Sequence, residues 1–441
     1  MNTSTGKVRR LVGVGTVGLA VCLLGACSSG GSGGGEAGGA GSGSFTYLSQ
    51  AENTTIQDTL KTLSTTTCAT AQAAAPLEVQ VGPAGTAWEQ KLQLLAGQDA
   101  LPNALMASGS PDLVKQLISA GQLEELSTTL QEQGVSDQIL PAAASTVKAL
   151  YGSDQLYALP TEFNIEGIWY NEQIFAEHGI EVPQTWDEFV AAVRTLADAG
   201  VQPISSNGEN GWNITRYVGN YIYRSLGPDA LQKVADGQAS LTDPEYVAAA
   251  DAVAELGAAG AFGEAVGSVD YNQALNTFLT GQAAMLYMGS WALDNFNDPA
   301  QNTVGVDNVG FMPFPAVTGG AGSIDQVPSN VGVPLVFASK DFGANQAAWV
   351  KCIAEGYGDT ALADSGVISG FKTTTAPTSD SPVTQAVQDT IADSTESVLW
   401  FEALFSSKGT TVSQTNASQL VTGAISGQEF MQMVQDANAS A

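Results

Sequence analysis

The sequence predicts an α/β protein of two domains. From residue 45 onward, short segments with strand periodicity alternate with longer segments that have helical spacing. Alternation of this kind predicts α/β architecture with mainly parallel sheets. Removing an N-terminal leader from the 441 residues leaves about 415, which suits two domains of ordinary size. The hydrophobic fraction of 44% is high enough for a large buried core.

The first elements follow one another closely. Residues 77 to 81 alternate apolar and polar side chains at period two, which predicts a strand. Pro111 suits the first turn of a helix, and Thr185 with Glu188 three residues later forms a capping-box pattern that opens another helix. The predicted order is strand 45–48, helix 54–67, strand 77–81, helix 88–96, helix 111–120 and a helix from residue 185.

The N-terminus has the pattern of a secretory signal. Basic residues, Lys7 to Arg10, precede an apolar run over 11–24 that is too short to span a bilayer, which takes about 20 apolar residues. Cys27 directly follows Leu-Gly-Ala and resembles the lipobox of bacterial lipoproteins, which implies cleavage after residue 26 and a lipid on Cys27. The alternative is an ordinary cleaved signal with a chance cysteine. Residues 27–44, rich in Gly and Ser, are expected to form a flexible linker.

Composition excludes some partners. Forty-four acidic residues against 15 basic ones give a net charge of −29. Such a surface repels nucleic acid and anionic lipid headgroups, so neither nucleic acid nor a basic-patch membrane contact is expected. After residue 27 we find no further long apolar segment, so the lipid would supply the only membrane attachment.

Two cysteines remain beyond the leader and the predicted lipid site. Cys68 and Cys352 are an even pair in an oxidising compartment. Because they are far apart in sequence, a disulfide and two buried free thiols both remain open at this stage.

The usual signatures of catalysis and cofactor binding are missing. His178, the only histidine, precedes Gly179 at an expected helix end, where a polar residue suits the helix dipole. We find no nucleophile elbow, phosphate-binding loop or dinucleotide fingerprint, and one histidine with two distant cysteines makes a poor zinc site. We therefore expect no catalytic residue, cofactor or metal. Glycoside hydrolysis needs only two carboxylates, and composition does not exclude it.

From residue 155 onward, the order of segments becomes distinctive. The segments, in order, are Gln155 to Pro160, Ile168 to Asn171, Ile174 to Gly179, Pro183 to Phe189, Thr277 to Met285, Met288 to Trp291 and Val309 to Pro315. In order and spacing they resemble the extracellular solute-binding proteins of bacterial sugar ABC transporters, the family that includes maltose-binding protein. The resemblance covers residues 45 to about 436.

The resemblance implies a two-lobed, periplasmic-binding-protein-like fold of type II. Each lobe would be a sheet flanked by helices, with a hinge and a central ligand cleft. Residues 45–157 and 316–354 would form the N-terminal lobe, and residues 158–315 and 355–441 the C-terminal lobe. This division puts Cys68 and Cys352 in one lobe, which favours a disulfide between them if their Cα atoms come within roughly 7 Å.

Sugar sites combine flat aromatic rings with polar side chains. The family presents an aromatic from the position of Trp291, although a core tryptophan is the alternative reading. Asp112 could equally stabilise its helix N-terminus, and the adjacent Trp400 and Phe401 are expected to send at most one ring to the cleft. The full set of candidates is Trp291, Trp212, Arg216, Asn164, Glu162, Asp112, Asn53, Trp400 and Phe401. Trp88, Trp169, Trp186 and Trp349 are expected to be packing residues.

The resemblance therefore predicts a monomeric, lipid-anchored binding protein of an ABC importer. It would capture a mono- or oligosaccharide outside the cytoplasmic membrane and deliver it to the permease subunits. Two alternatives are the same architecture with another solute, such as a polyol, a phosphate ester or a polyamine, and an anchored glycoside hydrolase.

Overall fold

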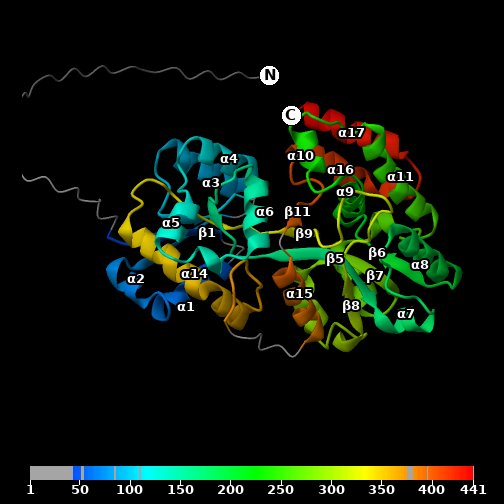
Figure 1. Cartoon of the computed structure of the whole chain (residues 1–441), viewed down its shortest axis with the longest axis horizontal. Helices are drawn as coiled ribbons and strands as arrows, with labels where there is room; N and C mark the ends of the chain where they lie inside the picture. The colour runs from blue at the N-terminus through cyan, green and yellow to red at the C-terminus, as the bar shows by residue number, and fades with distance from the viewer. Residues whose placement is uncertain are drawn as a thin grey trace, which may run out of the picture. The chain divides into compact units, whose positions relative to one another are not determined.

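Figure 1 shows the computed structural model of the chain. It describes residues 43–50, 54–83, 86–108, 111–374, 381–394 and 396–440. These residues belong to one of the two units into which the chain divides, Gly39–Ala441. The signal, Cys27 and nearly all of the predicted linker lie outside the described residues. The helices and strands form a mixed α/β fold with two sheets, as predicted.

The first sheet has the strand order β2-β1-β3-β10-β4. Its strands are β1 (Phe45–Gln50), β2 (Leu77–Gly82), β3 (Ala104–Met106), β4 (Ala158–Leu159) and β10 (Leu335–Phe337). β1 pairs in parallel with β2 and β3, whereas β10 is antiparallel to β3 and β4. The helices around it are α1 (Thr55–Thr65), α2 (Ala69–Ala74), α3 (Thr86–Gly97), α4 (Pro111–Ser119), α5 (Leu126–Glu132), α6 (Pro141–Tyr151) and α14 (Ala344–Ser365), with the short turn η1 (Ser136–Gln138).

The second sheet has the order β11-β9-β5-β7-β6, and β8 also pairs with β5. Its strands are β5 (Asn164–Asn171), β6 (Gln202–Ser205), β7 (Ala283–Gly289), β8 (Val309–Met312), β9 (Val327–Asn330) and β11 (Ser397–Val398). The remaining helices are α7 (Glu172–Glu177), α8 (Trp186–Asp198), α9 (Trp212–Leu226), α10 (Ala230–Ala235), α11 (Pro244–Ala258), α12 (Tyr271–Leu279), α13 (Leu293–Asn297), α15 (Pro382–Asp393), α16 (Ser407–Val421) and α17 (Gly427–Ala439). Three further 3₁₀ turns are η2 (Val266–Ser268), η3 (Ser290–Ala292) and η4 (Val306–Asn308).

The prediction of mainly parallel sheets is wrong, because among the described residues two of the four strand pairings in the first sheet and three of the five in the second are antiparallel. In the second sheet, β5 is antiparallel to β7, β8 and β9, and only β6 with β7 and β11 with β9 pair in parallel. The alternation of strands and helices along the chain does not specify which strands meet or in which direction. The partners of β5 come from residues 283 to 330, so this pairing is set by contacts distant in sequence.

β7 explains how the second sheet is buried. All seven of its residues are buried, and the four from Met285 to Met288 alternate between two apolar clusters. Leu286 and Met288 pack in the cluster that also holds the first sheet, whereas Met285 and Tyr287 pack against the helices on the opposite face, among them α9. A strand covered on both faces needs a continuous apolar run, which β7 has.

Several local predictions are confirmed. The Thr185 side chain caps α8 together with Glu188, and His178 ends α7 just before Gly179, whose φ is +64°. The four tryptophans expected to pack are all buried, with exposed fractions of 1% for Trp88, 0% for Trp169, 7% for Trp186 and 0% for Trp349.

A disulfide joins two helical segments that flank the first sheet. The sulfur atoms of Cys68 and Cys352 are 2.09 Å apart and the Cα atoms 5.1 Å apart. Cys68 lies between α1 and α2, and Cys352 lies within α14, which packs against both helices. Across the described part of the chain, we find no helix with the length and apolarity required to cross a membrane.

Candidate ligand-binding site

Trp291 is a partly exposed aromatic residue at the end of a buried strand. It follows β7 in the turn η3 and keeps 37% of its surface exposed. Within the described ranges, no other aromatic residue is among the large exposed hydrophobic side chains. The Trp291 ring lies against Gly289, where an added Cβ would stand 2.0 Å from a ring carbon. Glycine therefore lets the indole rest on the backbone while part of it stays exposed.

Trp212 and Tyr271 complete a cluster that we call the aromatic corner: Trp212, Tyr271 and Trp291. Trp212 is the first residue of α9, and its ring centroid lies 5.8 Å from that of Trp291 at an interplanar angle of 56°. Tyr271 begins α12 and shares a side-chain hydrogen bond with Trp291. Burial raises the pKa of Tyr271, and this hydrogen bond opposes part of the shift. The corner thus holds two indole rings inclined to each other.

Arg216 lies one helical turn after Trp212 and connects the aromatic corner to two carboxylates. Its guanidinium carbon is 5.3 Å from the Trp212 ring centroid, within the range of a cation–π contact. Nε donates to Glu166 Oε2 at 2.6 Å, and Nη1 donates to Glu402 Oε2 at 2.7 Å. Burial lowers the pKa of Arg216, but the charges of Glu166 and Glu402 outweigh it and the net shift is upward. Arg216 is therefore a permanent cation.

Both carboxylates are buried and hydrogen-bonded. The side chain of Glu166 is 0% exposed and that of Glu402 is 1% exposed. Buried charges of this kind are tolerated only when they are paired and their oxygens are satisfied. Four neighbouring groups supply the donors: Tyr287 Oη at 3.3 Å and Asn330 Nδ2 at 3.3 Å for Glu166, and Thr215 Oγ1 and Ser413 Oγ, the latter at 3.2 Å, for Glu402.

Asn164 lies beside this network. Its Nδ2 donates to Asn330 Oδ1 at 3.4 Å, and its Oδ1 accepts a hydrogen bond from Ser290 Oγ at 3.2 Å. Ser290 directly precedes Trp291. Glu162 is two residues before Asn164, and its carboxylate lies against Gly332, where an added Cβ would stand 2.3 Å from Oε2. The start of β5 and the end of β9 therefore bring Asn164 and Asn330 together beside Ser290, the residue before Trp291.

The structure brings Trp291, Trp212, Arg216 and Asn164 into one neighbourhood, but not every predicted site residue. Phe401 is 1% exposed and packs against Phe405 with centroids 4.8 Å apart, so Trp400 is the member of that pair with exposed surface. Asp112 lies at the start of α4, where its exposed carboxylate is 3.8 Å from Lys115 Nζ. Asn53 lies outside the described residues.

Sequence reasoning missed Glu166, Glu402 and Tyr271. Nothing in the local pattern marks them: Glu166 lies within a strand of mostly apolar residues, and Tyr271 is one aromatic among many. Glu402 directly follows Trp400 and Phe401, so the adjacent aromatic pair was the available signal. Across the described residues, no three His, Cys, Asp or Glu side chains gather as a candidate metal site.

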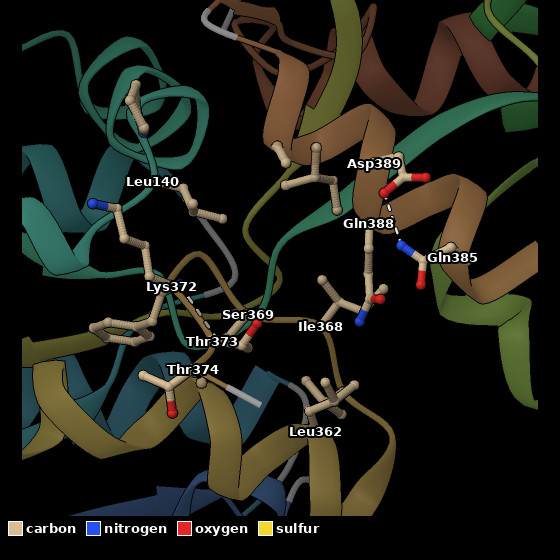
Figure 2. Close-up of a pocket in the computed structure, with 16 residues that line it drawn as sticks. Leu140, Leu362, Ile368, Ser369, Lys372, Thr373, Thr374, Gln385, Gln388 and Asp389 are labelled. Atoms are coloured by element: carbon tan, nitrogen blue, oxygen red, sulfur yellow. Dashed lines mark hydrogen bonds between the residues drawn. The ribbon is translucent and has the colours of Figure 1, made fainter. Parts of the chain in front are cut away.

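A separate pocket shares no lining residue with the aromatic corner. Figure 2 shows Leu362, Ile368, Ser369, Gln388 and other side chains around this pocket, which is lined by α14, α15, the chain after α14 and the residues Leu140 and Pro141 at the start of α6. The pocket has a volume of about 540 Å³. Gln385 donates to Asp389 at 2.7 Å along one wall. The lining contains no tryptophan. We therefore place the candidate ligand site at the aromatic corner.

Comparison with known proteins agrees with this fold. The chitin oligosaccharide binding protein is 25% identical, with a TM-score of 0.70 over 90% of this chain and 100% of that chain. A probable sugar-binding periplasmic protein of Mesorhizobium japonicum is 26% identical over 53% of this chain and 58% of its own length. The multiple sugar-binding protein of Streptococcus mutans is 28% identical over 32% of this chain and 35% of its own length.

The matches to these curated relatives cover less than two thirds of their lengths. The match to a family model covers a larger part of this chain. Residues 76–341, more than half of the chain, match the model described as bacterial extracellular solute-binding protein. The two-sheet α/β fold agrees with that match, and this chain belongs to the bacterial extracellular solute-binding protein family.

Proposed function

We propose that this protein is the substrate-binding component of a bacterial ABC importer and that its ligand is a mono- or oligosaccharide. The observation that carries the proposal is the aromatic corner, in which the partly exposed Trp291 stands 5.8 Å from Trp212. Pyranose rings offer apolar C–H faces to aromatic rings and hydroxyl groups to polar side chains. The names of the sugar-binding relatives support the same ligand class.

Polar residues near the corner would bind the hydroxyl groups. Arg216 Nη2 has no hydrogen-bond partner in the described part of the chain, and the side chain is 10% exposed. We propose that this nitrogen donates a charge-assisted hydrogen bond to the sugar, the stronger kind of hydrogen bond. Asn164, Glu162 and Trp400 would add contacts, and Asp112 and Asn53 would be further contacts from the proposed N-terminal lobe. We omit Phe401 because it is buried.

The proposed transport cycle follows from two lobes that close over the ligand. We propose that residues 45–157 and 316–354 form one lobe and residues 158–315 and 355–441 the other. A ligand that contacts both lobes shifts the population toward the closed state, which the permease subunits would then recognise. A monomer is sufficient for this cycle.

The family name places the protein outside the cytoplasm, and the N-terminal pattern supports a lipid anchor. We propose that Cys27 carries the lipid and that residues 28–44 form the linker to the outer face of the membrane. We also propose that the protein does not catalyse a reaction on its ligand, because Glu166 and Glu402 are both paired with Arg216. Oligosaccharides incubated with the purified protein should remain intact, and product released at catalytic rates would favour a glycoside hydrolase.

A panel of sugars tests the proposal directly. A ligand that binds only the folded state raises the melting temperature, so thermal shift identifies the sugar. With that sugar, Trp291→Ala should weaken binding by about tenfold or more, measured by calorimetry, because one stacking face is lost. The variant should keep the wild-type circular dichroism spectrum.

Met433→Ala is the matched control for this test. Met433 is 38% exposed, close to the 37% of Trp291, and lies on α17 outside the candidate site. The Met433→Ala variant should bind the sugar with the same affinity as the wild type. Unchanged affinity in Trp291→Ala would remove Trp291 from the site, and a panel without any stabilising sugar would contradict the carbohydrate assignment.

A further inference from the structure

A buried group of three charged residues lies next to the aromatic corner, and stacking of a sugar on the indole rings does not itself require these charges. One buried arginine contacts two buried carboxylates, so Arg216, Glu166 and Glu402 together carry one negative charge. Arg216 is also the cation that lies over the Trp212 ring, at 5.3 Å. A lone arginine next to a sugar site would attract anionic ligands. Here its charge is more than compensated, and the excess is negative.

The two carboxylates also determine where the guanidinium lies. Nε and Nη1 point to acceptors on different elements, Glu166 on β5 and Glu402 after β11. Two charge-assisted bonds at 2.6 Å and 2.7 Å define the plane of the guanidinium and therefore its position against the Trp212 ring. This leaves Nη2 as the donor not used by the described residues.

We propose that Glu166 and Glu402 are positioning and specificity residues: they hold Arg216 against Trp212, and their charges make the site select uncharged saccharides over anionic ones. This inference rests on the proposed function. Neither carboxylate needs to touch the ligand. A carboxylate or phosphate on the ligand would meet a net negative cluster in a poorly solvated place, where like charges repel strongly. Neutral hydroxyl groups accept from Arg216 Nη2 without this repulsion.

Matched neutral and anionic sugars test the specificity. The probes are glucose with glucuronate and galactose with galacturonate, measured by calorimetry, because each pair differs only in the carboxylate at C6. The wild type should bind the neutral member of at least one pair and bind its anionic partner about tenfold more weakly or worse. Glu402→Gln should weaken the neutral sugar by about tenfold and bring the two affinities of the pair closer together.

Glu355→Gln provides the control for the change in net charge. Glu355 lies on α14, is 42% exposed and pairs with Lys351 at 3.9 Å, so its substitution removes one negative charge from the surface. It should leave both affinities of a pair within about twofold of the wild type. If Glu402→Gln does not fold, Ser413→Ala removes one hydrogen bond from Glu402 and keeps its charge. It should weaken the neutral sugar and leave the ratio of the two affinities unchanged.

A readout without ligand separates this inference from the proposed function. The emission of Trp212 is obtained as the difference between a protein and its Trp212→Phe counterpart. Glu402→Gln should change this difference spectrum because Arg216 moves relative to the indole. A Glu402 that only stabilises the fold would lower the melting temperature and leave the spectrum unchanged, which would overturn the positioning role. Equal binding of both members of a pair by the wild type would overturn the specificity role. Failure of every sugar would overturn the proposed function and the specificity role with it, whereas the positioning role is decided by the emission spectrum alone.

Discussion

Gly289 controls how Trp291 is presented. The residue is fully buried at the end of β7, and the indole of Trp291 occupies the space that a side chain would take. Any Cβ at residue 289 would therefore meet the ring rather than solvent. The indole is a side chain and can move, whereas a backbone could not. A substitution at Gly289 should therefore lower sugar affinity more than it lowers the stability of the fold.

The first prediction at this scale is that Gly289→Ala weakens sugar binding. The added Cβ would stand 2.0 Å from the Trp291 ring, which must shift and lose its alignment with Trp212. We expect an affinity loss of about tenfold, on the scale of one lost stacking contact, with a stability loss of about 1 kcal/mol. Calorimetry and urea unfolding measure the two effects.

Gly97→Ala is the control for that prediction. Gly97 is the last residue of α3, and a Cβ there would meet nothing within 4 Å. The Gly97→Ala variant should bind the sugar like the wild type and should be no less stable, because alanine at a helical position restricts the unfolded chain. Full sugar affinity in Gly289→Ala would mean that the position of the Trp291 ring is unimportant for binding.

At the scale of elements, α9 carries two of the candidate residues. Trp212 and Arg216 are one turn apart on it, and residue 211 before it is a glycine with φ of +75°. A Cβ at Gly211 would also stand 1.9 Å from the carbonyl oxygen of Gln414 on α16. The start of α9 and the body of α16 are therefore in direct backbone contact, and this contact sets the position of Trp212.

Gly211→Ala should therefore be strongly destabilising. A left-handed conformation alone makes a non-glycine residue about 1–2 kcal/mol less favourable, and the clash with a backbone oxygen adds to it. Gly423→Ala separates the two effects, because Gly423 has a similar φ of +74° and open space around it. We expect the free energy of unfolding to fall by about 1 kcal/mol in Gly423→Ala and by at least about twice that in Gly211→Ala. Equal losses in urea unfolding would show that the contact with α16 relaxes freely.

The elements also show what could be predicted from sequence. Period-two alternation in residues 77–81 predicts β2, and the Thr185 capping box predicts the start of α8; both signals are local, and both elements are present. The direction of β5 relative to its neighbours was missed because its partners lie more than a hundred residues away. The candidate site divides in the same way. Trp291 and Trp212 could be proposed from their local context, but the pairing of Arg216 with both Glu166 and Glu402 depends on the folded chain.

At the scale of the whole molecule, the first sheet is assembled from distant parts of the chain. β10 and α14 come from residues 335–365, whereas the other strands of the first sheet and the other helices around it lie between residues 45 and 159. The disulfide between Cys68 and Cys352 closes a loop with a sequence separation of 284 and joins these two parts directly. A cross-link over so long a loop restricts the unfolded chain, which is the main way in which disulfides stabilise proteins.

The last prediction is that this disulfide contributes measurably to stability. Replacing both cysteines, Cys68→Ala with Cys352→Ala, should lower the free energy of unfolding by about 2–4 kcal/mol, the typical effect of a native disulfide. Reductant should lower the urea midpoint of the wild type and leave that of the double variant unchanged, which controls for other effects of the reductant. Reactive thiols at both positions in denatured, unreduced protein would contradict the bridge. Because Cys352 lies on α14 and Trp291 lies beyond β7, the double variant that remains folded should keep its sugar affinity, so the loss would concern folding of the first sheet and not the ligand site.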